Sequence, residues 1–225
     1  MAVNYATVPI IRDGLQIYID IANSKSYDGT AVLQSLVGTT TMTVTGATYS
    51  TEVGGMFACD GVNDRITTTI PNMGSTELCT VSLWMKTPMN NDSMLMGFRY
   101  FSLYNSGNKL GFNRGAGDQY GINLTQIQAL GLQNEWKYYT LVFDRTDTSA
   151  CKMYINASPI TLSQQAGSAG STNFDSGNFS IGCWNSAHTP GYFSPPKVAN
   201  IKIYNRELTQ AEIVHNYHIA SGRIS

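Results

Sequence analysis

The stretch IKIYNRELTQAEIVHNY at residues 201–217 decides the fold, because a strand pattern runs directly into a fully specified helix start. Thr209 suits an N-cap and Glu212 stands three residues later, which is the T-x-x-E capping box. Leu208 and Ile213 flank the box as a hydrophobic staple. We therefore predict a helix of about three turns that begins after Thr209 and stops near Gly222. Its apolar stripe is expected to comprise Ile213, Tyr217 and Ala220.

Before this helix, short segments alternate between apolar and polar residues, with the period of two that is typical of half-buried strands. GLQIYID at 14–20 and TVSLWMKT at 80–87 are clear cases. WKYYTLVFD at 136–144 and CKMYINA at 151–157 flank the turn-like RTDTSA and predict an antiparallel hairpin. Further strands are expected at 54–59, 64–70, 94–104, 109–113, 119–124, 178–184 and 198–204.

Many short strands and a single helix predict an all-β fold, a two-sheet antiparallel β-sandwich with one short C-terminal α-helix. The composition agrees, because Thr, Ser, Asn and Gly make up 82 of the 225 residues and favour strands joined by tight turns. SQQAGSAGSTNFDSGN at 163–178 is expected to be a surface loop. The length fits one large domain.

The charge balance and the apolar segments exclude several function classes. Charged residues make up 13% of the chain and the net charge is −1, so no basic surface for nucleic acid is expected. No segment approaches the roughly 18 apolar residues that cross a bilayer, and the first residues lack a secretory-signal pattern. We therefore expect no membrane partner and synthesis in a cytoplasm without secretion. The four cysteines have no metal-type spacing and are expected to be buried free thiols.

The first dozen residues form a separate segment, so we predict an arm at 1–12 and one domain at 13–225. The arm contains Tyr5, Val8, Ile10 and Ile11, which give it an apolar character. Two uses remain open: the arm adds an edge strand to a sheet, or it docks on another chain, as donated strands do.

Strand-borne catalytic carboxylates are not indicated. Glycoside hydrolysis needs two carboxyl groups that flank one bond. The chain has five glutamates, and none lies within two residues of another acidic residue. No nucleophile elbow, metalloprotease or phosphate-loop motif is present either. We therefore expect a protein without enzymatic activity.

One segment has the composition of a calcium loop. Asp60, Asn63 and Asp64 place three oxygen-bearing side chains beside a Gly-enabled bend. Calcium takes six to eight oxygens, so other segments would have to converge on this one. The alternative is an ordinary turn in which Asp and Asn side chains bind their own backbone. No other cofactor is indicated.

Two aromatic, Gly-rich segments are candidates for sugar binding, which uses aromatic platforms beside amide and carboxylate groups. GCWNSAHTPGYFSPP at 182–196 and RGAGDQY at 114–120 have this composition. The alternative is that the aromatic rings pack beneath the loops as core. The candidate residues are Trp184, Asn185 and Tyr192 in the first segment, and Arg114, Asp118 and Tyr120 in the second.

Several segments resemble the laminin-G-like, concanavalin-A-like jelly rolls, especially single-domain versions in tailed-phage virion proteins. They are GLQIYIDIANSKSYDG at 14–29, GGMFACDGVNDRI at 54–66, TVSLWMK at 80–86, and W-x-x-x-T-x-x-x-D, KMYIN and IYNRELTQAEI within 136–213. The resemblance covers nearly the whole chain and implies a jelly-roll sandwich. The Y-x-N-G turn of the family reads Tyr-Ile-Asn-Ala at 154–157 in this chain.

The resemblance implies two functions, because one such fold serves both structural proteins and lectins. The first is a non-enzymatic virion protein, a capsid decoration, cement or head-fibre protein. It would bind other virion proteins such as the major capsid protein, and it could also form a homo-oligomer. The second is a carbohydrate-binding module on a virion or cell surface that binds host glycans and aids adsorption.

Overall fold

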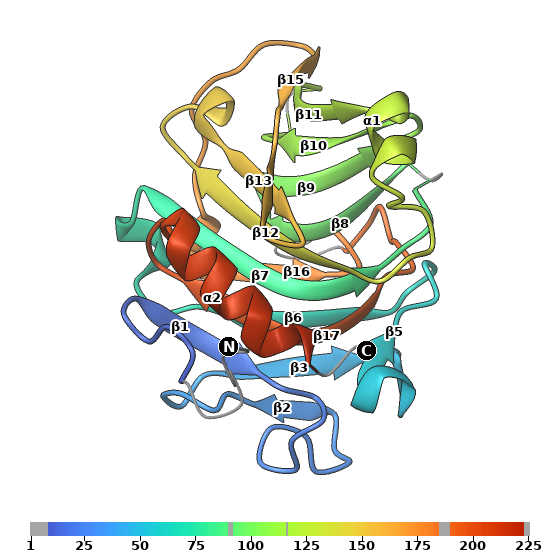
Figure 1. Cartoon of the computed structure of the whole chain (residues 1–225), viewed down its shortest axis with the longest axis vertical. Helices are drawn as coiled ribbons and strands as arrows, with labels where there is room; N and C mark the ends of the chain where they lie inside the picture. Colours follow the sequence, from blue (N-terminus) through green and yellow to red (C-terminus); the bar gives the residue numbers. More distant parts are fainter. Residues whose placement is uncertain (1–8, 90–91, 116, 185–189, 223–225) are drawn as a thin grey trace, which may run out of the picture.

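Two antiparallel β-sheets packed face to face form the body of the protein (Figure 1). The computed structural model describes residues 9–89, 92–115, 117–184 and 190–222. Strands from all parts of the chain contribute to both sheets, and the two helices lie at the outside. This arrangement confirms the predicted all-β sandwich.

The order of the strands in space differs from their order along the chain in both sheets. The eight-stranded sheet contains, from one edge to the other, β14 (Ser158–Ile160), β13 (Lys152–Ile155), β12 (Lys137–Asp144), β7 (Leu78–Lys86), β17 (Lys197–Tyr204), β5 (Met56–Ala58) and β4 (Thr48–Ser50), and β1 (Leu15–Ile19) pairs with β17. The nine-stranded sheet contains β15 (Ser163–Ala166), β11 (Gln119–Asn123), β10 (Lys109–Asn113), β9 (Phe101–Ser106), β8 (Ser93–Phe98), β16 (Asn178–Ile181), β6 (Arg65–Thr69), β3 (Thr41–Thr45) and β2 (Val32–Gln34). The helices are α1 (Leu124–Ala129) and α2 (Gln210–Ser221), with 3-10 turns at Glu52–Gly54, Met73–Ser75, Thr148–Ala150 and Asp175–Gly177.

The core lies between the two sheets and is rich in aromatic rings. Phe143 of β12 meets Phe98, Phe101 and Phe112 of the opposite sheet edge-on, with ring centroids 6.1, 5.1 and 5.0 Å away. All four rings are buried. Edge-to-face contacts add to the free energy of burial, so this cluster is a main source of stability.

The central strands of the eight-stranded sheet are buried on both faces, because α2 covers their outer side (Figure 1). Along β12, Leu141 faces the central core whereas Val142 packs with Leu208 and Ile213 of the helix segment. Trp84 of β7 packs with Ala220 at the other end of α2. Near-continuous burial along β7 and β12 follows from this double cover.

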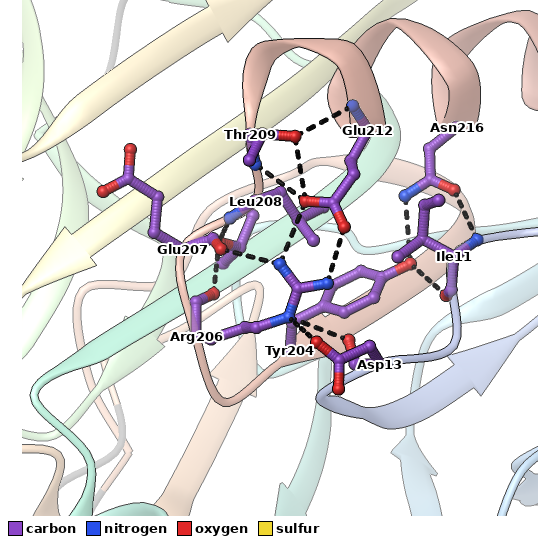
Figure 2. A network of polar contacts seen from close by, with 10 residues as sticks. Ile11, Asp13, Tyr204, Arg206, Glu207, Leu208, Thr209, Glu212 and Asn216 are labelled. Atoms are coloured by element: carbon purple, nitrogen blue, oxygen red, sulfur yellow. Dashed lines mark hydrogen bonds and ion pairs between the residues drawn. The ribbon is translucent and has the colours of Figure 1, made fainter.

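The start of α2 has the capping box that the sequence predicts (Figure 2). The Thr209 hydroxyl accepts from the Glu212 N–H at 3.3 Å, and the Thr209 N–H donates to Glu212 Oε2 at 2.8 Å. Arg206 adds two further hydrogen bonds, from Nη2 to Glu212 Oε1 at 2.7 Å and from Nη1 to Oε2 at 3.0 Å. The bonds from Arg206 are the largest cause that lowers the Glu212 pKa to about 2. The helix ends at Ser221, before Gly222, as predicted.

The buried side of α2 differs from the predicted stripe at one position. Ile213 and Ala220 are buried and Tyr217 is half-buried, but the polar Asn216 is buried as well. Asn216 Nδ2 donates to the Tyr204 hydroxyl at 3.0 Å, and its Oδ1 accepts from the Ile11 N–H at 3.2 Å. The helical period places Asn216 on the buried face, three residues after Ile213 and four before Ala220, but an apolar stripe leaves out a polar residue. Its burial is favourable because distant partners satisfy its amide. Among the described residues, no helix is both long and apolar enough to cross a bilayer.

Residues 9–12 of the predicted arm pack on the domain itself. Ile10 is buried, the Tyr204 hydroxyl donates to the Ile11 carbonyl at 3.0 Å, and His215 Nε2 lies 2.9 Å from the Pro9 carbonyl (Figure 2 shows the contacts of Ile11). These four residues form no strand, so they do not add an edge strand to either sheet. Ile11 packs against the cluster that contains Ile213 of α2, and docking of Ile10 and Ile11 on a second chain stays a prediction. Tyr5 and Val8 lie outside the described residues, and docking through them stays a prediction.

Several local expectations were incomplete. The predicted strand 94–104 is a hairpin, β8 and β9, whose turn at Arg99 and Tyr100 contains none of the residues that mark turns. The loop expected at 163–178 begins with β15, which pairs with β11.

The predicted β12–β13 hairpin is confirmed. All four cysteines are buried and free, as expected. Short elements that were not expected are α1, β2, β3, β4 and β14.

Candidate functional site

A pocket of about 270 Å³ lies where the two aromatic, Gly-rich segments meet. It opens on the outer face of the nine-stranded sheet, because Leu103 of β9 points into the core and Tyr104, the next residue, points the other way. The two segments are about 70 residues apart in sequence but both contribute to this one pocket. Its described lining consists of Met94, Tyr104, Asn113, Gly115, Gly117, Trp184 and Tyr192.

Backbone hydrogen bonds fasten segment 182–196 onto β8. Trp184 and Gly191 exchange two N–H···O bonds of 2.8 and 3.1 Å, which close a small antiparallel bridge. The Met94 N–H donates to the Tyr192 carbonyl at 2.9 Å, and the Ser194 hydroxyl donates to the Met94 carbonyl at 2.7 Å. The described ends of this segment are therefore fixed on the sheet and hold Trp184 and Tyr192 in place.

The aromatic rings of the pocket stand edge-on to one another. Tyr192 lies with its ring centroid 6.2 Å from Trp184 and 6.5 Å from Tyr104, at interplanar angles of 82° and 89°. Trp184 Nε1 donates to the Arg99 carbonyl at 2.6 Å, which fixes the indole. Tyr192 is 55% exposed and has a left-handed φ of 49°, unusual for a tyrosine. An exposed ring held in a rarely adopted conformation points to a role other than core packing.

Segment 113–118 is closed by a clamp of polar contacts. Asp118 accepts from the backbone N–H of Arg114 and from its Nε, both at 3.2 Å. Asn113 Nδ2 donates to the Asp118 carbonyl at 2.6 Å, and the Gly115 N–H donates to Asn113 Oδ1 at 2.7 Å. Asp118 is only 1% exposed. It is therefore held within the loop and is not among the described lining of the pocket, so a sugar contact by Asp118 stays a prediction.

The remaining predicted sugar-binding residues divide between the pocket and other places. Trp184 and Tyr192 line the pocket as predicted. Tyr120 pairs with the core residue Phe112 in the β10–β11 ladder and so faces away from the pocket, with its hydroxyl 3.4 Å from the Leu162 carbonyl. Asn185 lies outside the described residues. Two of the expected residues thus meet at the site.

Sequence reasoning missed Tyr104, Met94 and Asn113, which complete the pocket. Tyr104 follows the alternating core residues Phe101 and Leu103 of β9, and that alternation indicates an outward-facing tyrosine. Its hydroxyl donates to the carboxylate of Asp92. Burial, followed by this hydrogen bond, raises the Tyr104 pKa, so the phenol stays protonated at neutral pH.

The predicted calcium segment forms a turn held by its own acidic side chains. Asp60 Oδ1 accepts from the N–H groups of Val62 and Asn63 at 2.7 and 3.2 Å, and Asp64 Oδ2 accepts from the Asp60 N–H at 3.0 Å. Burial raises the Asp64 pKa. Within the described ranges, no three His, Cys, Asp or Glu side chains are grouped as a metal site requires. The geometry is that of the alternative interpretation, a self-capped turn, and calcium there stays a prediction.

Solved structures with the same fold include proteins with sugar ligands. The receptor-binding domain of botulinum neurotoxin C/D mosaic serotype matches with a TM-score of 0.63 and 13% identity, over 92% of this chain and 52% of that one. The botulinum neurotoxin serotype D domain in complex with N-acetylneuraminic acid gives 0.61 and 14%, over 92% and 51%. Trypanosoma rangeli sialidase in complex with sialic acid gives 0.67 and 16%, over 96% and 34%. The chain thus spans about half or less of these structures, and at this identity they establish the fold alone.

The family of this chain follows from a match to a family model. No curated protein shows significant sequence similarity to this chain. A family model described as the concanavalin A-like lectin/glucanases superfamily, of laminin-G type, matches residues 60–214. That range includes most strands of both sheets, the pocket and the start of α2. The match covers well over half of the chain, and the chain therefore belongs to the concanavalin A-like lectin/glucanase superfamily.

Proposed function

We propose that this protein binds carbohydrate, without catalysis, through the pocket formed by Tyr104, Trp184 and Tyr192. The observation that carries the proposal is the convergence of two distant loops on one set of aromatic rings at the outer face of the nine-stranded sheet. Aromatic rings pack against the C–H face of a sugar, and nearby polar groups orient its hydroxyls.

The size and the polar groups of the pocket suit one sugar ring. At about 270 Å³ the pocket is slightly below the range of roughly 300 to 1,000 Å³ that is usual for drug-sized ligands. Asn113, Gly115 and Gly117 place an amide and backbone groups beside the rings, although Asn113 also bonds to Gly115 and to the Asp118 carbonyl within the loop. None of the described lining residues carries a carboxylate, which suits binding rather than glycoside hydrolysis.

The structural relatives are consistent with the proposal. A botulinum neurotoxin ligand binding domain and a trypanosomal sialidase, each matched by this chain over part of its length, were solved with sialic acid. The support for this chain comes from its own pocket, because such distant similarity carries no ligand with it.

The proposal is tested by titrating sugars while the tryptophan fluorescence is measured, together with a glycan array. A single ring of about 12 heavy atoms, at about 0.3 kcal/mol per atom, binds with a Kd in the millimolar range, so monosaccharides must be titrated to tens of millimolar. We expect Tyr192→Ala to weaken binding at least about tenfold, the size of a hot-spot truncation. Tyr49→Ala is the matched control, since Tyr49 is 38% exposed on β4 of the other sheet. Binding that survives Tyr192→Ala unchanged would exclude this pocket.

A virion role is the second candidate function and follows from the resemblance to phage structural domains. The low share of charged residues, 13%, supports it, because closely packed copies then repel one another weakly. The major capsid protein would be the partner, and the chain would be made in the host cytoplasm and reside in the virion. Deletion of residues 1–8 leaves the contacts of Pro9 and Ile11 with the domain in place. If this truncated chain co-sediments with particles as the full chain does, docking through Tyr5 and Val8 is wrong.

A further inference from the structure

We infer that the pocket selects an uncharged sugar ring and discriminates against acidic sugars such as uronic and sialic acids. This inference rests on the proposed carbohydrate-binding function and deepens it. It separates this chain from the structural relatives solved with sialic acid. Three observations on the charges around the pocket carry it.

First, the described lining contains no cationic side chain. Recognition of a carboxylate normally uses a guanidinium or ammonium group, whose charge-assisted hydrogen bonds replace the water lost from the anion. Without that group, an acidic sugar would lose hydration on entering a space lined by three aromatic rings and Met94. A neutral sugar ring carries no charge and therefore loses less hydration free energy on entering the pocket.

Second, the arginines next to the pocket are engaged elsewhere. Arg114 directs Nε to Asp118 at 3.2 Å and Nη2 to the Ser168 carbonyl at 3.1 Å. Arg99 contributes its backbone carbonyl to Trp184, whereas its guanidinium lies over the Tyr100 ring, 4.6 Å from the centroid. Neither guanidinium is among the groups that line the pocket, and releasing Arg114 would leave the buried Asp118 carboxylate without its cation.

Third, a carboxylate stands at the edge of the pocket. The exposed Asp92 accepts a hydrogen bond from the hydroxyl of Tyr104, which lines the pocket. The same hydroxyl oxygen keeps lone pairs that accept from a sugar O–H. At low salt, repulsion between this carboxylate and the charge of an anionic ligand should cause about a three- to tenfold loss of affinity.

The test compares methyl glycosides with the corresponding methyl uronides, in the gluco and galacto configurations, because each pair differs only by the carboxylate at C6. Tryptophan fluorescence and NMR chemical-shift titrations are run at 10 mM and 300 mM salt. We expect the preferred glycoside to bind at least threefold more tightly than its uronide at low salt, and the ratio to fall at high salt. Asp92→Asn keeps an acceptor for Tyr104 and should narrow the ratio about threefold or more. Glu135→Gln makes the same change of charge at an exposed position in the bend before β12, and it should leave the ratio as in the wild type.

The outcomes distinguish carbohydrate binding from charge discrimination. If neither member of any pair binds, and a glycan array is also negative, the proposed carbohydrate function fails. If a uronide or a sialylated glycan binds as tightly as its neutral partner, the discrimination fails while carbohydrate binding stands. If Asp92→Asn changes the ratio no more than Glu135→Gln does, the part assigned to Asp92 is overturned.

Discussion

Replacing Glu212 by Gln should make the stability of this protein less dependent on pH. In the folded chain, Glu212 accepts two hydrogen bonds from Arg206 and one from the Thr209 N–H, and its pKa is lowered from 4.5 to about 2. A carboxyl group whose pKa falls on folding stabilises the protein above its unfolded pKa, and that stabilisation disappears as the pH drops towards its folded pKa. The relevant window is therefore from about pH 5 down to about pH 2.

The magnitude follows from the shift and the exposure of the pair. A shift from 4.5 to about 2 corresponds to roughly 3 kcal/mol at about 1.36 kcal/mol per pKa unit. The side chains of Arg206 and Glu212 are 27% and 23% exposed, so solvent screening reduces the expected value to about 2 kcal/mol. A glutamine keeps the capping hydrogen bonds, as Gln126 does in the capping box of α1. Glu212→Gln therefore removes mainly the charge.

The assay is urea unfolding of both proteins at pH 7 and pH 3, because urea leaves ion pairs unscreened. We expect Glu212→Gln to be about 2 kcal/mol less stable than the wild type at pH 7. The difference should fall to about 0.8 kcal/mol at pH 3, because a folded-state pKa of about 2 keeps most of the carboxylate ionised there. The control Glu135→Gln, at an exposed position, measures how much the free energy of unfolding changes when one negative charge is removed outside the Arg206–Glu212 pair. A difference at pH 7 no larger than that of Glu135→Gln, or one that is equal at both pH values, would refute the assignment of the shift to Arg206.

Three further substitutions test the fold. Thr209→Ala removes the N-cap of α2 and should lower the free energy of unfolding by about 1 kcal/mol, measured by urea denaturation. Gly121→Ala would place a methyl group 2.0 Å from the Leu110 carbonyl oxygen across the β10–β11 ladder and should lower the free energy of unfolding by more than about 2 kcal/mol. The control Gly107→Ala, with open space around its Cβ, should lower it by only about 1 kcal/mol because of its left-handed φ. Equal losses of stability in the two variants would contradict the packing argument. Phe143→Ala should cost about 3 to 5 kcal/mol through the cavity left among its aromatic neighbours, and a loss under about 1 kcal/mol would show that the core readjusts around it.

The features that were predictable from sequence are those with local causes. The α2 cap depends on Thr209 and Glu212, three residues apart, and the β12–β13 hairpin depends on adjacent segments. The capping box of α1, Asn123 with Gln126, carries the same kind of signal but was overlooked within a strand-rich region. The β8–β9 turn at Arg99 and Tyr100 has no turn residue by which it could be recognised.

The candidate site was only partly predictable, because its composition is local and its geometry is not. The aromatic residues Trp184 and Tyr192 were recognisable in a Gly-rich segment, but nothing local indicates that Tyr104 stands beside them. Asp118 has the chemistry of a ligand contact, yet its ion pair with Arg114 buries it within its own loop. The burial of Asp118 depends on how its loop closes, and residue type alone does not predict it.

The two outer faces of the sandwich differ: one carries α2 and residues 9–12, and the other carries the pocket. On one side, α2 and residues 9–12 are bound together through Asn216, Tyr204 and Ile11. The pocket opens on the other side, from the outer face of the nine-stranded sheet. A copy tethered through the residues that precede Pro9 would therefore carry its aromatic pocket pointing away from the support, and a layer of such copies would present a uniform array of pockets to the surrounding solution.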